Sequence, residues 1–274
     1  MNFKREAGLL GVRLHQFLSA SRLFDKRTAS GSGGRVFFPG CGMAGRGPEL
    51  VARVHDFLRE IYPDIGLFGS CCAKPSQALG GESFLKRARV LTRRFREAGV
   101  KRVIVVCPNC AATLACVPGI QVVPIWRVLD EHFDRLKGRI RTQDLVLPAL
   151  SMHDPCPARG DASLQEAVRS VLRRAHIEFL EFPQGKRAMC CGKAGMLAVT
   201  NPKASRGILE RCVAQSPAPD MLTYCFSCAD SFRSAGRRSF HALEILFADP
   251  APIQIYSGVW RNRFRTSRFI ASLR

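Results

Sequence analysis

Ten of the twelve cysteines in this chain follow one spacing pattern that occurs twice. Each copy has an isolated cysteine, then an adjacent pair, then two cysteines separated by two residues. The intervening segments are 29 and 34 residues long in the first copy and 33 residues each in the second. Five thiols at matched spacing, repeated once, predict two metal clusters on a duplicated scaffold. The cysteines are Cys41, Cys71, Cys72, Cys107 and Cys110 in the first copy and Cys156, Cys190, Cys191, Cys225 and Cys228 in the second.

The duplication divides the 274 residues into two repeats of about 110 residues each. The extension that precedes them ends in the flexible linker Ser30-Gly31-Ser32-Gly33-Gly34. Within it, Leu10, Leu14, Phe17 and Phe24 recur at helical spacing and predict a basic amphipathic helix over residues 6–24. We expect a basic extension and linker at 1–34, the first repeat at 35–142, the second at 143–256 and a basic, aromatic tail at 257–274.

The formal net charge of +20 indicates attraction to acidic surfaces. Such surfaces include nucleic acid, anionic lipid, an acidic protein partner and anionic cofactors carried within the chain. Metal-bound thiolates would offset part of this charge, because each deprotonated cysteine adds a negative charge that the formal count omits.

The cysteine content, about 4% of the chain, lies well below that of small disulfide-stapled domains. Arg13 and His15 interrupt the only apolar stretch near the start, so we expect no signal peptide. No run approaches the roughly 18 apolar residues of a membrane span. We therefore expect a cytoplasmic protein, with peripheral contact at the inner membrane face as an option. In that compartment clustered cysteines usually serve metal or redox chemistry.

Short apolar strands alternate with amphipathic helices in both repeats. This alternation predicts an α/β fold of two pseudo-symmetric repeats, each a small, mostly parallel sheet flanked by helices. Most motif cysteines fall at or just beyond strand carboxyl ends, where ligands bind in such sheets, so five sulfurs would converge in each repeat. Expected strands cover residues 36–38, 65–68, 103–106, 120–123, 145–152, 177–182 and 221–224, and expected helices cover 48–61, 82–98, 126–136, 162–175 and 202–214.

Several roles compete for these cysteines. Burial as small apolar side chains does not explain why the same five positions recur. Disulfides require an oxidising compartment, and a bridge between the neighbours Cys71 and Cys72 would be strained. Zinc is a serious alternative, since a CxxC motif with two further thiolates satisfies its tetrahedral preference. Five thiolates exceed what zinc needs, whereas a multi-iron centre can use all five. The common ferredoxin cysteine run is absent.

The motifs resemble the cysteine-rich "CCG" domain of heterodisulfide reductase B subunits, which is also found in succinate, glycolate and lactate oxidation proteins. The resemblance covers about residues 35–250. The motifs that carry it are Pro39-Gly40-Cys41, Cys71-Cys72, Cys107-Pro108-Asn109-Cys110, His153-Asp154-Pro155-Cys156, Cys190-Cys191-Gly192 and Cys225-Phe226-Ser227-Cys228.

This resemblance implies that each five-cysteine set binds a non-cubane [4Fe-4S] cluster and that a disulfide is cleaved between the two clusters. Two departures concern the first copy. Ala73 follows its cysteine pair where the family usually has glycine, and its 29-residue interval is short. If one site holds zinc or a different cluster, we therefore expect it to be the first.

Four other residues are candidates for roles beside the clusters. Lys74 and Lys193 occupy the same offset after each cysteine pair, where a cation would raise a cluster's reduction potential or hold an anionic substrate; an exposed lysine is the alternative. His153 and Asp154 precede Cys156 and could donate protons, or could simply orient the loop. Two cysteines outside the pattern, Cys116 and Cys212, are expected to be buried.

We therefore expect an iron–sulfur oxidoreductase subunit that relays electrons to or from a disulfide, quinone or similar acceptor between the two clusters. With no flavin or nicotinamide motif, it would need partner subunits, such as a flavin or ferredoxin-type protein. The alternative is a zinc-stabilised scaffold whose basic termini bind a membrane, a partner or nucleic acid. Nucleic-acid binding rests on charge alone and ranks last. Five arginines interleave with aromatic residues in the tail: Arg261, Arg263, Arg265, Arg268 and Arg274.

Overall fold

The computed structural model describes residues 3–21, 23–28, 33–80, 82–140, 149–247 and 258–273. Some expected features lie outside the described residues. These are the boundary at 142–143, residues 30–32 of the linker, residues 145–148 of the strand expected at 145–152, and residues 257 and 274 of the tail. The chain divides into two compact units, unit 1 with residues 1–125 and 256–274, and unit 2 with residues 126–255.

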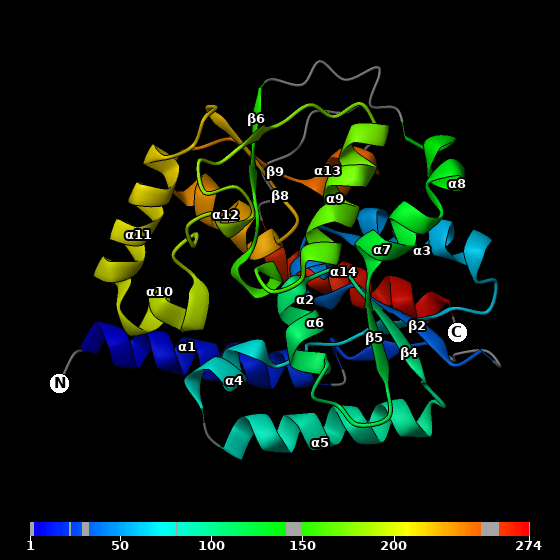
Figure 1. The fold of residues 1–274 in the computed structure, drawn as a ribbon. Coiled ribbons are helices and arrows are strands. Elements are labelled where there is room, and N and C mark those ends of the chain that lie inside the picture. The colour runs from blue at the N-terminus through cyan, green and yellow to red at the C-terminus, as the bar shows by residue number, and fades with distance from the viewer. Residues whose placement is uncertain are drawn as a thin grey trace. The chain divides into compact units, whose positions relative to one another are not determined.

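Unit 1 is built on a five-stranded sheet in the order β1-β3-β2-β4-β5. Figure 1 labels three of these strands, β2, β4 and β5. All neighbouring strands are parallel except the edge pair β1 and β3. The strands are β1 (Lys26–Arg27), β2 (Arg35–Phe38), β3 (Gly66–Gly69), β4 (Arg102–Val105) and β5 (Gln121–Pro124). The helices are α1 (Phe3–Ala20), α2 (Gly40–Ala44), α3 (Pro48–Ile61), α4 (Lys74–Leu79), α5 (Glu82–Glu97), α6 (Pro108–Leu114) and α14 (Val259–Ser272).

Unit 2 has an all-parallel sheet in the order β7-β6-β8-β9. Its strands are β6 (Leu150–His153), β7 (Leu180–Glu181), β8 (Asp220–Thr223) and β9 (Ser239–His241). Its α-helices are α8 (Phe133–Lys137), α9 (Ala162–Arg174), α10 (Leu197–Thr200), α11 (Pro202–Ala214), α12 (Phe226–Ser234) and α13 (Ala242–Leu246), with most of α7 (Ile125–Glu131). Three short 3₁₀ helices are η2 (Cys156–Ala158), η3 (Gly185–Arg187) and η4 (Ala194–Met196).

The two units repeat one strand order, since β3-β2-β4-β5 of unit 1 corresponds to β7-β6-β8-β9 of unit 2. This confirms the predicted fold class of parallel-rich α/β repeats. The strand expected at 177–182 is shorter in the structure. Only Leu180 and Glu181 pair with β6, at the sheet edge, where both residues are exposed.

Apolar residues on both faces of the unit 1 sheet explain why helices cover it. Phe38 points to the face that α5 covers with Leu91 and Phe95. Phe37 lies on the opposite face, where its ring stacks on His55 of α3. Side chains alternate across a strand, so a strand of continuous apolar residues needs a helix on each face.

Most of the expected basic, aromatic tail forms helix α14, which packs into unit 1. Helix α14 contacts α2, α3, β1 and β3. Its buried residues are Asn262, Arg263, Thr266, Ser267 and Ile270. Two glycines make room for it, because a Cβ at Gly45 would lie 2.8 Å from Val259 Cγ1 and one at Gly69 only 2.3 Å from Ile270 Cδ1.

The N-terminal helix α1 buries a different face from the one its sequence suggests. The apolar residues of the expected stripe, Leu10, Leu14 and Phe17, are 67%, 56% and 73% exposed. Gln16 and Ser19, which are polar, are buried instead. The helix spans Phe3–Ala20 instead of the expected residues 6–24, and Gln16 and Ser19 on its buried side hydrogen-bond to Cys71 and Arg263.

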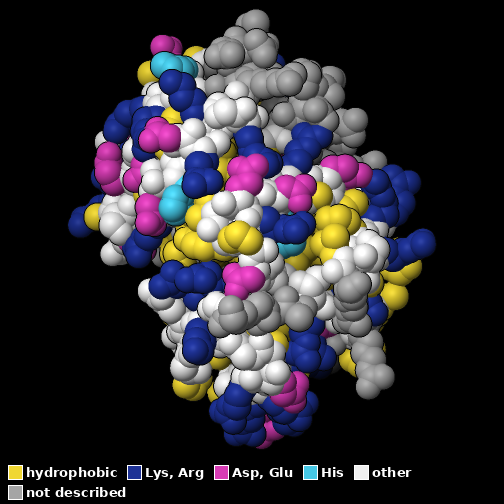
Figure 2. Space-filling model, turned by 90° about the vertical axis from the view of Figure 1, so that its right-hand side faces the viewer, with side chains coloured by type: hydrophobic (Ala, Val, Ile, Leu, Met, Phe, Trp, Pro, Cys, Tyr) yellow, Lys and Arg dark blue, Asp and Glu magenta, His cyan; other side chains and the backbone are white. Residues whose placement is uncertain are grey.

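Basic residues are spread over the surface rather than gathered in one place on the face shown in Figure 2, where Lys and Arg side chains are interspersed with Asp and Glu. None of the described helices combines the length and the apolar character needed to cross a bilayer.

Candidate metal centres

Unit 1 brings its five motif cysteines to one end of the sheet. Cys41 lies in α2, just beyond β2, and Cys71 and Cys72 follow β3. Cys107 follows β4, and Cys110 lies in the next helix, α6. The Cys110 thiol donates to Cys72 Sγ at 3.3 Å, Cys41 hydrogen-bonds Cys71, and Cys107 hydrogen-bonds Cys110. Parallel strands end at the same edge, which is why residues far apart in sequence meet here.

Unit 2 repeats the arrangement. Cys156 begins η2 after β6, and Cys225 follows β8. Hydrogen bonds join Cys156 to Cys190, Cys190 to Cys191, Cys191 to Cys228 and Cys228 to Cys225. All five thiols of this unit are therefore connected through sulfur contacts.

The turn after each cysteine pair has the same backbone form. Ala73 has φ 63° and Gly192 has φ 85°, both in the left-handed region. In each copy the backbone N–H of this residue donates to the first sulfur of the pair: Ala73 to Cys71 Sγ at 3.5 Å, Gly192 to Cys190 Sγ at 3.3 Å. Holding alanine in this conformation costs about 1 kcal/mol relative to glycine. The departure at Ala73 therefore changes the residue type and leaves the turn unchanged.

The first cysteine of the adjacent pair has a lowered pKa in both units. The hydrogen bond with Cys41 lowers the pKa of Cys71 to about 6, against the opposing effect of burial. Hydrogen bonds with Cys156 and then Cys191 lower the pKa of Cys190 to about 2. The thiolate is the form of cysteine that binds metals, so the first cysteine of each pair is prepared for coordination.

The other predicted residues take varied positions. Lys74 donates to Gln77 Oε1 at 2.9 Å within α4. The pKa of Cys191 is raised to about 11, mainly by the hydrogen bond with Cys190. The backbone N–H of Lys193 also hydrogen-bonds to Cys191, and this smaller effect lowers the pKa. His153 is fully buried, and its Nε2 lies 2.8 Å from Met189 O.

The expectation that Cys116 and Cys212 are both buried is wrong for Cys116. Cys116 is exposed near the end of α6. Cys212 is buried, donates to Met189 O at 3.4 Å, and has its pKa raised to about 12 by burial.

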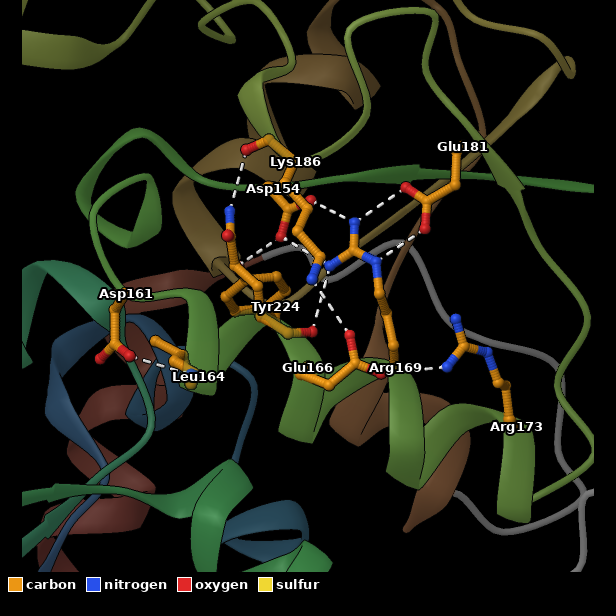
Figure 3. A network of polar contacts seen from close by, with 10 residues as sticks. Asp154, Asp161, Leu164, Glu166, Arg169, Arg173, Glu181, Lys186 and Tyr224 are labelled. Atoms are coloured by element: carbon orange, nitrogen blue, oxygen red, sulfur yellow. Dashed lines mark hydrogen bonds and ion pairs between the residues drawn. The ribbon is translucent and has the colours of Figure 1, made fainter.

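Asp154 anchors a buried polar network beside the second cysteine set (Figure 3). The Arg169 guanidinium donates to both Asp154 carboxylate oxygens, at 3.2 and 2.5 Å, and to both oxygens of Glu181, at 2.7 and 2.8 Å. The Tyr224 hydroxyl donates to Asp154 Oδ1 at 2.6 Å. Asp154 lies two residues before Cys156, and Tyr224 directly precedes Cys225. The network therefore ties together two loops that carry cysteines, which favours orientation over proton donation for Asp154.

The first cysteine set is flanked by side chains that the sequence analysis did not connect with it. Gln16 of α1 donates to Cys71 Sγ at 3.7 Å. Arg263 of α14 lines a small cavity with Cys41, and its charge lowers the pKa of Cys71 as a smaller effect than the Cys41 hydrogen bond. Burial lowers the pKa of Arg87 of α5, and the nearby charges of Cys71 and Cys72 raise it by a smaller amount. No motif signalled these contacts, because the residues lie outside the cysteine pattern.

His15 makes the stability of unit 1 sensitive to acid. Burial, and then the charge of Arg263, lower the pKa of His15 to about 4 from 6.5. As pH falls through 6.5, the unfolded chain gains a proton that the folded protein does not bind until about pH 4. The free energy of unfolding should therefore decrease over this range. We expect His15→Phe to lose less stability than the unchanged protein between pH 6.5 and 4, measured by hydrogen exchange of unit 1 amides. Equal losses in the two proteins would contradict this.

In the described part of the chain, no three or more Cys, His, Asp or Glu side chains are arranged so that they could hold a metal ion. The thiol contacts instead run from sulfur to sulfur in each unit.

A cavity of about 610 Å³ borders Leu150, at the start of β6 and so at the opposite end of that strand from Cys156.

Comparison with known proteins places these features in context. A family model described as CCG, cysteine-rich domain, matches residues 36–115 and 150–233, more than half of the chain. The glycolate oxidase iron-sulfur subunit of Escherichia coli (strain K12) is 32% identical over 101 residues, covering 35% of this chain. The matched segment spans 24% of that protein's length.

Two solved structures show only weak likeness. One is an aspartate racemase from Picrophilus torridus, at 10% identity, covering 78% of this chain and 90% of its own, with a TM-score of 0.34. The other is an aspartate racemase homologue from Pyrococcus horikoshii OT3, at 11% identity, covering 87% and 98%, with a TM-score of 0.28. Scores this low carry no argument about function.

Proposed function

Because the chain belongs to the CCG cysteine-rich domain family, with two copies of the domain, we propose that it is an iron–sulfur subunit of an oxidoreductase. The observation that carries the proposal is the gathering of five thiols at equivalent places in the two units. Sulfur contacts join all five in unit 2, and in unit 1 they join Cys41 to Cys71 and Cys72 to Cys110 and Cys107. The name of the E. coli relative supports the same class of subunit.

The residues present fit a polynuclear cluster. Soft thiolates select zinc or iron–sulfur centres over harder metals, and one thiol of each set has a lowered pKa. The backbone of unit 1 also leaves room beside its sulfurs, because Gly40 has φ 70° and a Cβ there would lie 3.1 Å from Cys110 Sγ.

In this proposal the first set of five cysteines holds one cluster and the second set holds the other. A bound iron–sulfur cluster supplies one-electron transfer at a potential set by its charge and surroundings. A non-cubane [4Fe-4S] form is the finer proposal, and it rests on the resemblance to heterodisulfide reductase B subunits. The chain's own residues hold the sulfurs in place and keep polar loops such as 154–156 rigid.

Partner subunits complete the proposal. The relative is named as a subunit, and this chain matches about a quarter of it. A flavin or ferredoxin-type protein would exchange electrons with the clusters, and a disulfide, quinone or similar compound would be the terminal acceptor or donor. A cytoplasmic location stays a prediction.

Metal analysis of anaerobically purified protein tests the function. We expect about eight iron atoms and a similar amount of acid-labile sulfide per chain if both sites hold four-iron clusters. A paramagnetic signal that changes when a thiol is added would support a disulfide as the acceptor. Fewer than about two irons, with zinc in their place, would refute the proposal.

A further inference from the structure

Arg263 is a buried cation held in one position by its neighbours. It is 6% exposed on helix α14. Its Nη2 donates to Ser19 Oγ at 2.8 Å, and its Nη1 lies 3.2 Å from His15 Nε2. Its guanidinium lies over the rings of Trp260, at 4.4 Å, and Phe24, at 5.2 Å. A guanidinium fixed on four sides keeps its charge at a constant distance from its surroundings.

No carboxylate among the described residues pairs with Arg263; its polar contacts are a hydroxyl and an imidazole. A buried charge without a counter-charge is costly, so one is expected nearby. Cys41 lines the same cavity, and the charge of Arg263 acts on both Cys41 and Cys71. The first cysteine set is therefore the source of negative charge that the structure places beside this cation.

The cavity is too small to bind a substrate. Its volume is about 20 Å³, close to that of a single water position. Ser70, which also lines it, has a buried hydroxyl with no hydrogen-bond partner in the described ranges. Arg263 is thus placed to act on the sulfurs themselves and not on a molecule that enters from solvent.

The helix that carries Arg263 is firmly seated. Asn262 Nδ2 donates to Gly45 O at 3.2 Å, and Thr266 Oγ1 donates to Ala44 O at 3.0 Å. Both acceptors lie on or next to α2, the helix that contains Cys41. The position of the charge relative to Cys41 is therefore set by hydrogen bonds between these two helices.

The corresponding cation of unit 2 differs in kind. The hydrogen bond with Cys190 raises the pKa of Cys156, and the charge of Arg159 lowers this pKa only as a minor effect. Arg159 is exposed to solvent. Water screens an exposed charge far more than a buried one. Two cysteine sets of the same pattern thus have different electrostatic surroundings.

We propose that Arg263, delivered by α14, raises the reduction potential of the cluster bound to the first cysteine set and so separates the potentials of the two clusters. This inference rests on the proposed function. Reduction adds one electron to a cluster, and a fixed positive charge in a poorly polarisable interior stabilises the reduced form. The basic C-terminal segment would then tune an internal redox centre.

Redox titration of the anaerobic protein, followed by electron paramagnetic resonance, tests this. The unchanged protein should show two midpoint potentials. In Arg263→Gln one midpoint should become more negative while the other keeps its value. Arg268→Gln removes the same charge from an exposed position on the same helix and should move neither midpoint. Replacing Cys190 and Cys191 with alanine should remove the midpoint that Arg263→Gln leaves in place, which assigns each midpoint to a unit.

The outcomes separate the inference from the proposed function. If the protein without any substitution binds no iron, the proposed function is overturned. Bound iron with both midpoints unchanged in Arg263→Gln overturns the inference alone. If Arg263→Gln and Arg263→Met both lose the first cluster, Arg263→Lys decides. Retention of that cluster in the lysine variant supports the role of the charge, and its equal loss indicates a packing role and overturns the inference.

Discussion

Replacing both Cys71 and Cys72 with alanine is expected to remove about half of the iron bound per chain. The two residues are 0% and 4% exposed, and each contacts another sulfur of the first set. Their loss leaves three thiols in unit 1, too few for a cluster held by four or five cysteines. The sulfur contacts of the second set lie within unit 2, so its iron should be retained.

Matched variants make this prediction sharp. Replacing Cys190 and Cys191 with alanine should remove the other half of the iron. Cys116→Ala, which removes an exposed thiol outside the pattern, should leave the iron content unchanged. Iron and sulfide would be measured on each anaerobically purified variant. Full iron content after loss of Cys71 and Cys72, or equal loss from Cys116→Ala, would show that these positions are not ligands.

Arg169→Met is expected to destabilise unit 2 by about 3–5 kcal/mol. Asp154 is 0% exposed, and without Arg169 the one hydrogen bond left to its carboxylate among the described residues is that from the Tyr224 hydroxyl. Breaking a buried ion pair on one side leaves an uncompensated charge, which costs more than the pair contributes. Glu181 is less affected, because its side chain is 39% exposed and can be hydrated.

The two tryptophans permit a measurement on unit 2 alone. Trp126 is buried in unit 2, 6.1 Å from the Tyr224 ring, and Trp260 lies in unit 1. In a Trp260→Phe background, urea unfolding followed by fluorescence therefore reports on the environment of Trp126. Arg173→Met is the control, since it breaks an exposed pair with Glu166 and should cost at most about 1 kcal/mol.

A double variant separates charge from packing in this network. Adding Asp154→Asn to Arg169→Met removes the uncompensated charge and should recover part of the lost stability. Because Asp154 and Tyr224 adjoin Cys156 and Cys225, Arg169→Met should also lower iron retention in unit 2. A cost no larger than that of Arg173→Met would show that the network does not hold these loops.

The placement of the cysteines could be predicted because it depends on local patterns. The apolar strands expected at 36–38 and 103–106 correspond to β2 and β4, which end shortly before Cys41 and Cys107, and parallel strands must end at one edge. The departure at Ala73 could not be interpreted from residue type, because only the backbone shows that it adopts the same turn as Gly192.

The amino-acid sequence by itself determined the duplication, the α/β class and the ten clustered thiols, because spacing and periodicity are properties of neighbouring residues. Only the tertiary structure decided what surrounds those thiols. The buried faces of α1 and α14 are largely polar, and Arg263 bonds to Ser19 across 244 positions of the chain. A hydropathy pattern places such polar faces in solvent. It contains no information on hydrogen bonds between distant segments, and these bonds are what allow the polar side chains to be buried.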